Sequence, residues 1–262
     1  MDIENYLKNG YYIGKTEELF EDYDLFKKYA KELCEFSKDI NKRFEKGFAY
    51  RFEYPNIHNE KINFSLRNFD EIKKTENYLK NNNLKTIQRW WEKGLGPLSE
   101  LNHYRNFFRG ATDSFISKIY PDLDDNIAHG DSLTIYDDGD FLERHTDGVH
   151  KERYCVILIY LSEKNDYIDG GGKLIVGNNE NDLKEVIPTN DTFVIMDFKK
   201  HDIIHEVEMV KNGFLRNTYI SFIHNEEKWF RNELEAGNTN FNKLDQFNKR
   251  VAKKLFPEKY NL

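Results

Sequence analysis

The sequence predicts an α+β protein with three parts: a mainly helical N-terminal region, a double-sheet jelly roll and a C-terminal helical extension. Up to about residue 125, apolar residues recur at steps of three and four, as on one face of a helix. After Asp131, short apolar runs follow one another between short polar links, as in a jelly roll. Helical spacing returns after His224. With no repeat and no long linker, we expect one compact unit divided at 1–125, 126–225 and 226–262.

Composition excludes several classes of protein. The 262 residues suffice for one large domain, and the net charge of −7 disfavours a surface that coats nucleic acid. The first ten residues lack the basic and apolar segments of a signal peptide, and no apolar run approaches the roughly 18 residues of a membrane span. We therefore expect a cytoplasmic protein without a membrane or nucleic-acid partner. The two cysteines, Cys34 and Cys155, lie in apolar patterns and predict buried thiols.

The N-terminal region opens with a predicted helix over residues 15–46, which Thr16 can cap. The apolar face of this helix comprises Phe26, Tyr29, Leu33, Phe36, Ile40 and Phe44, and Gly47 ends it. Residues 48–66 alternate irregularly and predict one or two strands around a turn at Pro55.

Further helices are predicted up to Pro121. Residues 69–93 predict two short helices separated by Asn81 to Asn83. Pro97 suits the first turn of another helix, and Pro121 stops its continuation. That helix would bury Leu101, Tyr104, Phe108, Ala111, Phe115 and Ile119 on one face.

The predicted strands begin with SLTIY. Residues 154–161, YCVILIYL, are continuously apolar, as is typical of a strand buried on both faces. Asp169 to Gly172 predicts a turn. The runs KLIV, EVIP, TFVIMDF, IIHEVEMV and FLRNTYISFI complete the set. A final helix is predicted from the stripe Phe241, Leu244, Phe247, Val251 and Leu255.

Residues 136–147, YDDGDFLERHTD, hold the most informative pair. His145 and Asp147 are two residues apart, so on a strand their side chains would leave the same face. An imidazole and a carboxylate placed side by side are two members of a metal site. A second imidazole would complete a two-His, one-carboxylate set, which suits a non-haem Fe(II) oxygenase because it leaves adjacent coordination positions open.

His205 is the candidate for the second imidazole. It shares a predicted strand face with Ile203 and Val207, whereas His201 lies in a polar loop. His150, just after the H-x-D motif, is expected near the site but not as a ligand. Both ligand imidazoles must be neutral, so we expect metal affinity to fall below about pH 6.

Five motifs in this order give the stretch from about residue 131 to 224 a resemblance to a known family. They are YDDGDFLERHTD, RYCVILIYLS, DGGGKLIV, IPTNDTFVIMDF and HEVEMVKNGFLR. Together they resemble the Fe(II)- and 2-oxoglutarate-dependent dioxygenases, in the prolyl-4-hydroxylase-like branch.

The resemblance implies a double-stranded β-helix with iron at one mouth. The implied iron ligands are His145, Asp147 and His205. Arg216 would hold the distal carboxylate of 2-oxoglutarate, for which its planar fork is suited. The other implied co-substrate contacts are Tyr136, Tyr160 and Leu174.

The reaction implied is oxidation of an unactivated C–H bond by O2, coupled to decarboxylation of 2-oxoglutarate to succinate and CO2, with ascorbate as a reductant the resemblance allows. Related radical halogenases lack the carboxylate ligand. Because Asp147 is present, we expect hydroxylation, with desaturation or ring formation as variants. The expected substrate is an amino acid, free or peptidyl, including prolyl. The alternative is a non-catalytic jelly-roll module that binds metal or a partner.

Two features leave alternatives open. Gly213 and Arg216 are one residue further apart than in the usual family motif, which a β-bulge would accommodate, and Lys211 is the other basic residue nearby. Arg144 and Arg153 flank the iron motif and would either meet an acidic substrate or form surface salt bridges.

Overall fold

The computed structural model describes residues 3–46, 48–57, 60–66, 69–81, 87–93, 101–121, 123, 127–149 and 153–225. The predictions for Gly47, Pro97, His150 and the C-terminal helix fall outside these residues.

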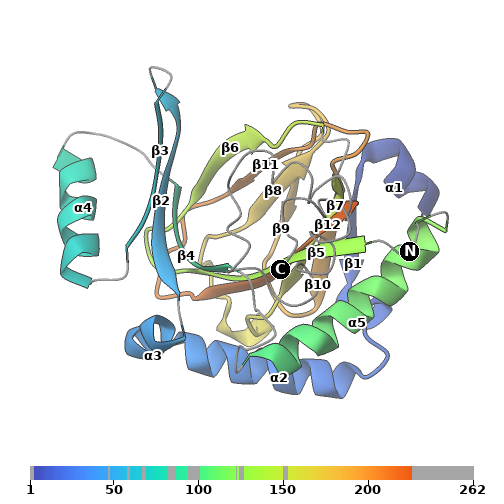
Figure 1. Cartoon of the computed structure of the whole chain (residues 1–262), viewed down its shortest axis with the longest axis horizontal. Coiled ribbons are helices and arrows are strands. Elements are labelled where there is room, and N and C mark those ends of the chain that lie inside the picture. Colours follow the sequence, from blue (N-terminus) through green and yellow to red (C-terminus); the bar gives the residue numbers. More distant parts are fainter. Residues whose placement is uncertain are drawn as a thin grey trace, which may run out of the picture.

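Two antiparallel sheets form the centre of the protein (Figure 1). The larger has the strand order β1-β10-β7-β12-β5-β4-β2-β3, and the smaller has the order β6-β11-β8-β9. The strands of the larger sheet are β1 (Tyr11–Lys15), β2 (Ala49–Ile57), β3 (Glu60–Leu66), β4 (Ile87–Lys93), β5 (Ile127–Tyr136), β7 (Arg153–Tyr160), β10 (Thr192–Asp197) and β12 (Arg216–Asn225). The strands of the smaller sheet are β6 (Leu142–Thr146), β8 (Leu174–Gly177), β9 (Lys184–Val186) and β11 (Ile204–Val207).

The eight strands described between residues 127 and 225 divide evenly between the sheets. Strands β5, β12, β7 and β10 are neighbours in the larger sheet, and β6, β11, β8 and β9 form the smaller one. The α+β class with two antiparallel sheets is confirmed, and two four-stranded sheets fit the predicted jelly roll. Strand β1 extends this core on one side, and β4, β2 and β3 extend it on the other.

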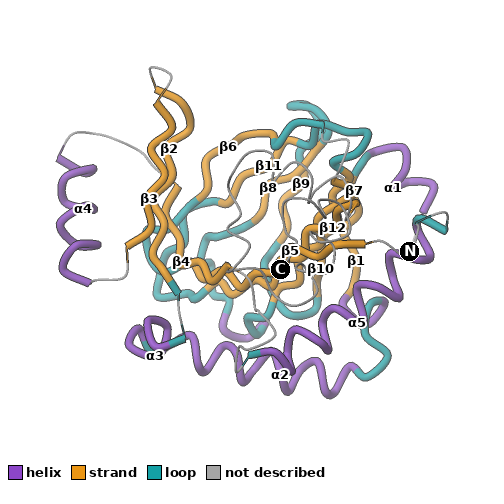
Figure 2. The backbone as a smooth tube through the Cα atoms, viewed as in Figure 1, coloured by secondary structure: helices purple, strands orange, loops and turns teal. Residues whose placement is uncertain are grey.

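The helices are α1 (Ile3–Asn9), α2 (Tyr23–Ser37), α3 (Ile40–Glu45), α4 (Phe69–Asn81) and α5 (Asn102–Ile119). Helices α2 and α5 run along the same side of the protein, whereas α4 lies beside the β2–β3 hairpin (Figures 1 and 2). Phe26 and Leu33 of α2 and Phe108 and Phe115 of α5 pack in one apolar cluster with Ile157 of β7. These helices therefore cover the outer face of the larger sheet. None of the described helices combines the length and the apolar composition needed to cross a bilayer.

The surroundings of β7 explain why its sequence is continuously apolar. Ile157 and Ile159 belong to the cluster beneath the helices, while Val156 and Leu158 belong to a second cluster that also contains residues of the smaller sheet. Both faces of β7 are therefore buried, as predicted. The second cluster lies between the two sheets and includes Tyr160.

The helix predicted over residues 15–46 was too long. Strand β1 ends at Lys15, a short 3-10 turn covers Thr16–Glu18, and α2 begins only at Tyr23. The predicted cap was also wrong, because the Asp22 side chain caps α2 by accepting from the Leu25 amide.

In the stretch 69–93, the described residues form the helix α4 and the strand β4, so the second of the two predicted helices was wrong where β4 lies. Strand β4 forms because its backbone pairs with β2 on one side and β5 on the other. Pro55 lies inside β2 rather than at a turn, near a register irregularity between Tyr54 and Ile57. With β1 to β4 included, the first 125 residues are less helical than predicted.

Candidate metal centre

Strand pairing places two imidazoles side by side. His145 of β6 and His205 of β11 are direct partners in the antiparallel ladder, and their ring centroids are 4.3 Å apart. The ladder shifts register immediately beyond this pair, on the side of Val207. Such irregularities are frequent beside active sites, where they alter the direction of a side chain.

Each imidazole is fixed through its Nδ1 atom by a carbonyl two residues earlier. The Nδ1 atom of His145 lies 2.7 Å from the Glu143 carbonyl oxygen, and that of His205 lies 3.1 Å from the Ile203 carbonyl oxygen. A carbonyl only accepts, so each Nδ1 must donate its proton, which leaves the Nε2 lone pair available for a metal. The backbone therefore sets the tautomer that a ligand needs.

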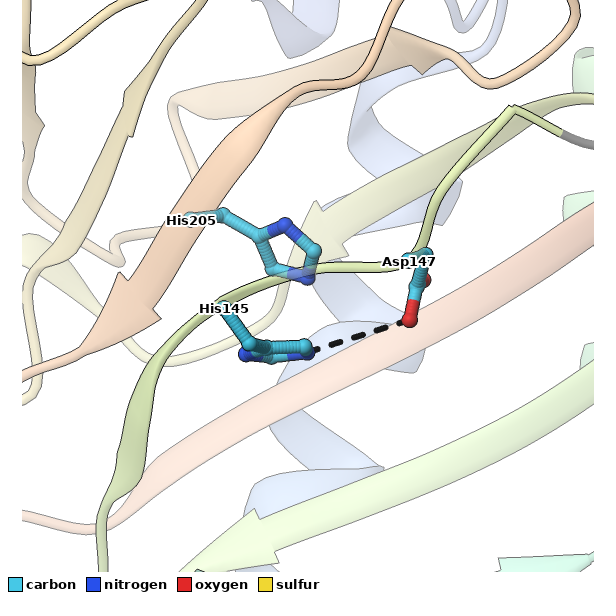
Figure 3. Close-up of side chains that lie close together, drawn as sticks. All are labelled: His145, Asp147 and His205. Atoms are coloured by element: carbon cyan, nitrogen blue, oxygen red, sulfur yellow. Dashed lines mark ion pairs between the residues drawn. The ribbon is translucent and has the colours of Figure 1, made fainter. Parts of the chain in front are cut away.

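Asp147 completes a three-residue cluster (Figure 3). One ligand atom from each of His145, Asp147 and His205 lies within 4.8 Å of the others, which is close enough for a single ion to reach all three. The structure thus brings together the three predicted ligands. Asp147 directly follows Thr146, the last residue of β6, so His145 lies on the strand and Asp147 just beyond its end.

The cluster has one buried and one open side. His205 is 7% exposed, whereas the side chains of His145 and Asp147 are 29% and 30% exposed. A metal held here would keep positions open toward solvent, as a catalytic centre requires.

The side chains of Arg144 and His201, the other residues considered for the site, have partners outside it. Arg144 forms ion pairs with Glu206 and Glu180 on the exposed outer side of the small sheet. The Nε2 atom of His201 lies 3.2 Å from the Leu7 carbonyl oxygen. His201 is not part of the ligand cluster.

Arg216 lies buried between two tyrosines. It is 2% exposed, and its guanidinium carbon is 4.9 Å from the Tyr136 ring centroid and 5.1 Å from that of Tyr160. Its Nε donates to the Gly172 carbonyl at 2.9 Å, and its Nη1 donates to the Thr218 hydroxyl at 2.9 Å. The contacts of Arg216 within the described ranges are with a carbonyl, a hydroxyl and two aromatic rings, none of which is an anion, so this buried cation is suited to an anionic ligand.

The Tyr160 hydroxyl is a second polar group suited to a ligand. It is buried and makes no hydrogen bond to any described residue. Burial raises the pKa of Tyr160 to about 12, although the nearby Arg216 charge opposes this rise. The hydroxyl therefore stays protonated at neutral pH and can donate. Tyr136 and Leu174, the other predicted contacts, are buried in the same inter-sheet cluster as Tyr160.

The segment before Arg216 explains why Gly213 and Arg216 are one residue further apart than in the usual family motif. Asn212 and Gly213 adopt positive φ angles of 60° and 70°, and they form a turn before β12 begins. From Arg216 to Asn225 the pairing of β12 with β5 is unbroken. The extra residue therefore belongs to the turn, not to a bulge. Lys211 is directed to the surface, where its Nζ lies 3.6 Å from Asp169.

The sequence did not indicate how Arg216 is oriented. Gly172 supplies a carbonyl from the predicted glycine turn, and Thr218 supplies a hydroxyl from the same strand face. Thr218 could have been found, because it lies two residues after Arg216 on a strand. The Gly172 contact depends on how two distant segments pack.

The fold and the cluster together describe a jelly roll that carries a candidate metal centre of two histidines and one carboxylate. Residues 132–224 match the sequence family described as the 2OG-Fe(II) oxygenase superfamily, and this match, which spans both His145 and His205, includes the whole cluster. This segment of the chain is therefore similar to the 2OG-Fe(II) oxygenase superfamily. Comparison with the curated proteins gave no match.

Solved structures share the fold across most of the chain. A Pseudomonas putida prolyl-4-hydroxylase is 16% identical, with 85% of this chain and 96% of that chain covered and a TM-score of 0.52. A Trichoplax adhaerens prolyl hydroxylase, solved with a peptide fragment of hypoxia inducible factor, is 16% identical, with 87% and 89% covered and a TM-score of 0.56. A 2OG-Fe(II) oxygenase family oxidoreductase from Burkholderia pseudomallei is 12% identical, with 86% and 92% covered and a TM-score of 0.54.

Proposed function

We propose that this protein is an Fe(II)- and 2-oxoglutarate-dependent hydroxylase of an unactivated C–H bond in an amino acid, free or peptidyl. The observation that carries the proposal is the convergence of His145, Asp147 and His205 on one point. The buried Arg216, beside the Tyr160 hydroxyl that lacks a partner among the described residues, gives independent support for a bound dicarboxylate.

The residues present fit the proposed metal and co-substrate. In this proposal, His145, Asp147 and His205 hold Fe(II), and Arg216 pairs with the distal carboxylate of 2-oxoglutarate. The Tyr160 hydroxyl donates to that carboxylate, while Leu174 and Tyr136 provide its apolar and aromatic surroundings. Iron with 2-oxoglutarate and O2 supplies the oxidising power to break a strong C–H bond, and the chain orients the reactants and limits access of water.

Asp147 bears on the type of reaction. A carboxylate ligand occupies the position that a halide would need for halogenation, so the three-ligand set favours hydroxylation. We expect Asp147→Gly to lose hydroxylation entirely. Undiminished product from Asp147→Gly would contradict the ligand assignment.

The substrate is proposed on weaker grounds. Two of the solved structures that share the fold are named as prolyl hydroxylases, and one of them holds a peptide. A screen for succinate formation with free amino acids and with proline-rich peptides separates the two forms of the proposal. Stimulation by peptides alone would rule out a free amino acid, and the absence of succinate from an iron-loaded protein with every substrate would contradict catalysis.

The alternative is a jelly-roll module that binds metal or a partner without catalysis. The presence of all three ligands together with the buried Arg216 disfavours this alternative, because a buried cation whose described partners are neutral is costly unless an anionic ligand pairs with it. Uncoupled turnover provides a test: iron-loaded protein should convert 2-oxoglutarate slowly to succinate even without substrate, and His145→Ala should not.

A further inference from the structure

We infer that Arg153 is a positioning residue that holds the carboxylate of Asp147 so that one oxygen alone faces the metal. The inference rests on the proposed iron site. It concerns the orientation of a ligand, and neither the substrate nor the co-substrate enters the argument.

Asp147 differs from the two histidines in how its backbone is held. His145 and His205 lie on paired strands, and each ring is anchored by the backbone carbonyl two residues earlier. Asp147 lies beyond the end of β6, with its side chain 30% exposed. A carboxylate in a loop rotates more freely than a ring anchored to a ladder, so its orientation depends on contacts from other segments.

Arg153 supplies such a contact on the far side of the carboxylate. Oδ1 of Asp147 faces the Nε2 atom of His145 at 3.8 Å, and Oδ2 faces Nη1 of Arg153 at 3.5 Å. The two oxygens therefore have different surroundings. Oδ1 lies on the side of the ligand imidazole of His145, and Oδ2 lies on the side of the Arg153 cation.

The guanidinium of Arg153 is itself fixed by the larger sheet. Its central carbon lies 4.7 Å from the ring centroid of Phe222 on β12 and 5.6 Å from that of Phe198, which directly follows β10. Cation–π contacts of this kind restrain a planar guanidinium against the ring faces. Arg153 thus connects the loop carrying Asp147 to the larger sheet.

This arrangement has a consequence for the metal. A carboxylate that bound through both oxygens would occupy a coordination position that the two-His, one-carboxylate centre must leave open. An ion pair at Oδ2 disfavours that binding mode, because the oxygen would have to leave the cation to reach the metal. Arg153 would therefore maintain the open positions of the site.

The test measures Co(II) binding, since the visible absorption of Co(II) reports its coordination geometry. Arg153→Lys keeps the charge and removes the fork, and Arg153→Met removes both. Arg144→Met is the matched control, because Arg144 directly precedes His145 but pairs with Glu206 and Glu180 on the outer surface. Thermal melting without metal identifies any variant that does not fold, and Arg153→Lys is the milder change if Arg153→Met fails.

We expect both Arg153 variants to bind Co(II) about tenfold more weakly, with an altered visible spectrum, as when other outer partners of metal ligands are lost. Arg144→Met also removes a positive charge near the site, so it should bind Co(II) at least as tightly as the wild type, with an unchanged spectrum. Arg153→Met tests the inference more strictly than Arg153→Lys. Removal of a nearby positive charge would by itself strengthen the binding of a divalent cation, whereas the inference predicts weaker binding. A loss of affinity in this variant must therefore come from misplacement of Asp147.

Wild-type affinity and spectrum in folded Arg153→Lys and Arg153→Met would overturn the inference, and so would tighter binding by Arg153→Met. Either result would leave the proposed function intact. If the wild type itself bound no Co(II), the metal site and this inference would fail together. The two kinds of failure are therefore distinguishable.

Discussion

The Nδ1 atoms of His145 and His205 show how the backbone prepares a ligand at the scale of single residues. Each donates to the backbone carbonyl two residues earlier, so the basic lone pair of each ring is on Nε2. Arg216 and Tyr160 are both buried, and both can still donate a hydrogen bond to an anion. Each residue is therefore prepared for its proposed role by its immediate surroundings.

Arg216 should dominate the binding of 2-oxoglutarate. Arg216→Met removes one member of a buried, charge-assisted pair, which typically costs about 2–5 kcal/mol, or at least roughly 30-fold in affinity. Arg216→Lys should recover part of this loss, because the charge remains without the fork. Isothermal titration of Mn(II)-loaded protein with 2-oxoglutarate measures both, with the exposed Lys211→Met as control. Wild-type affinity in Arg216→Met would disprove the role of Arg216.

Tyr160→Phe should weaken the binding of 2-oxoglutarate without lowering the stability of the ligand-free protein. The proposed hydrogen bond to the co-substrate contributes about 0.5–1.5 kcal/mol, so 2-oxoglutarate should bind roughly two- to tenfold more weakly. Without ligand, the variant should be as stable as the wild type or slightly more stable, because it removes a buried hydroxyl that has no partner among the described residues. Thermal melting and titration together test this. A clear loss of ligand-free stability would indicate that the hydroxyl has a structural role.

At the scale of elements, the site depends on turns as much as on strands. The Asp169–Gly172 turn contains two glycines with positive φ, Gly171 at 62° and Gly172 at 65°. An added Cβ at Gly171 would overlap the Met209 carbonyl oxygen, and Gly172 supplies the carbonyl that accepts from Arg216. The glycines therefore allow two loops to pack closely beneath the proposed co-substrate site.

Gly171→Ala should accordingly be more damaging than an alanine at another positive-φ glycine. Gly213, with φ at 70°, has open space around its Cα, so Gly213→Ala should cost only the backbone penalty of about 1–2 kcal/mol. Gly171→Ala should cost that penalty plus the displacement of the loop at Met209, and it should weaken 2-oxoglutarate binding through Gly172. Urea unfolding and titration would measure the two effects. Equal losses of stability in both variants would contradict the close packing at Gly171.

The elements that the sequence predicted well are those whose pattern is local. The apolar runs of the jelly roll follow from short β-branched segments, and α5 follows from its regular apolar face. Strand β4 was misread as a helix because its extended form depends on pairing with β2 and β5, which no local pattern reveals. The break between α2 and α3 was missed although Asp39 caps α3 with its side chain, a signal that could have been used.

The site residues also divide into those with a local sequence signal and those whose placement depends on distant segments. His145 and Asp147 are two residues apart and could be recognised as a local pair. The sequence selected His205 by its place on an apolar strand face and by the family resemblance. The direct pairing of His205 with His145 depends on strand register across 60 residues of chain, which neither signal gives. The contacts of Arg153 with Phe198 and Phe222 join three separate elements, so they could not be predicted from sequence spacing.

At the scale of the whole molecule, the two sheets bring the proposed ligand groups together from both sides of the inter-sheet core. The metal cluster takes both imidazoles from the smaller sheet, whereas Arg216, Tyr136 and Tyr160 come from the larger sheet. Helices α2 and α5 cover the opposite face of the larger sheet (Figure 1). A ligand that bridges the two sheets should therefore stabilise the jelly roll as a unit.

Metal and co-substrate should together raise the melting temperature. At ligand concentrations about 100 times the dissociation constant, binding contributes about 2.7 kcal/mol. For a chain of this size, that corresponds to a rise of roughly 5–10 °C. Differential scanning calorimetry with Mn(II) and 2-oxoglutarate, followed by a chelator, tests this. The chelator should reverse the rise, and no rise in the presence of both ligands would contradict binding between the sheets.

The most direct test of the central claim is optical and needs no knowledge of the substrate. Fe(II) is added without oxygen to the purified protein, followed by 2-oxoglutarate, and the visible spectrum is recorded for the wild type and for His145→Ala. Iron at the three ligands with 2-oxoglutarate bound predicts a metal-to-ligand charge-transfer band in the wild type that is missing from His145→Ala. A folded wild-type protein that shows no such band would contradict the account.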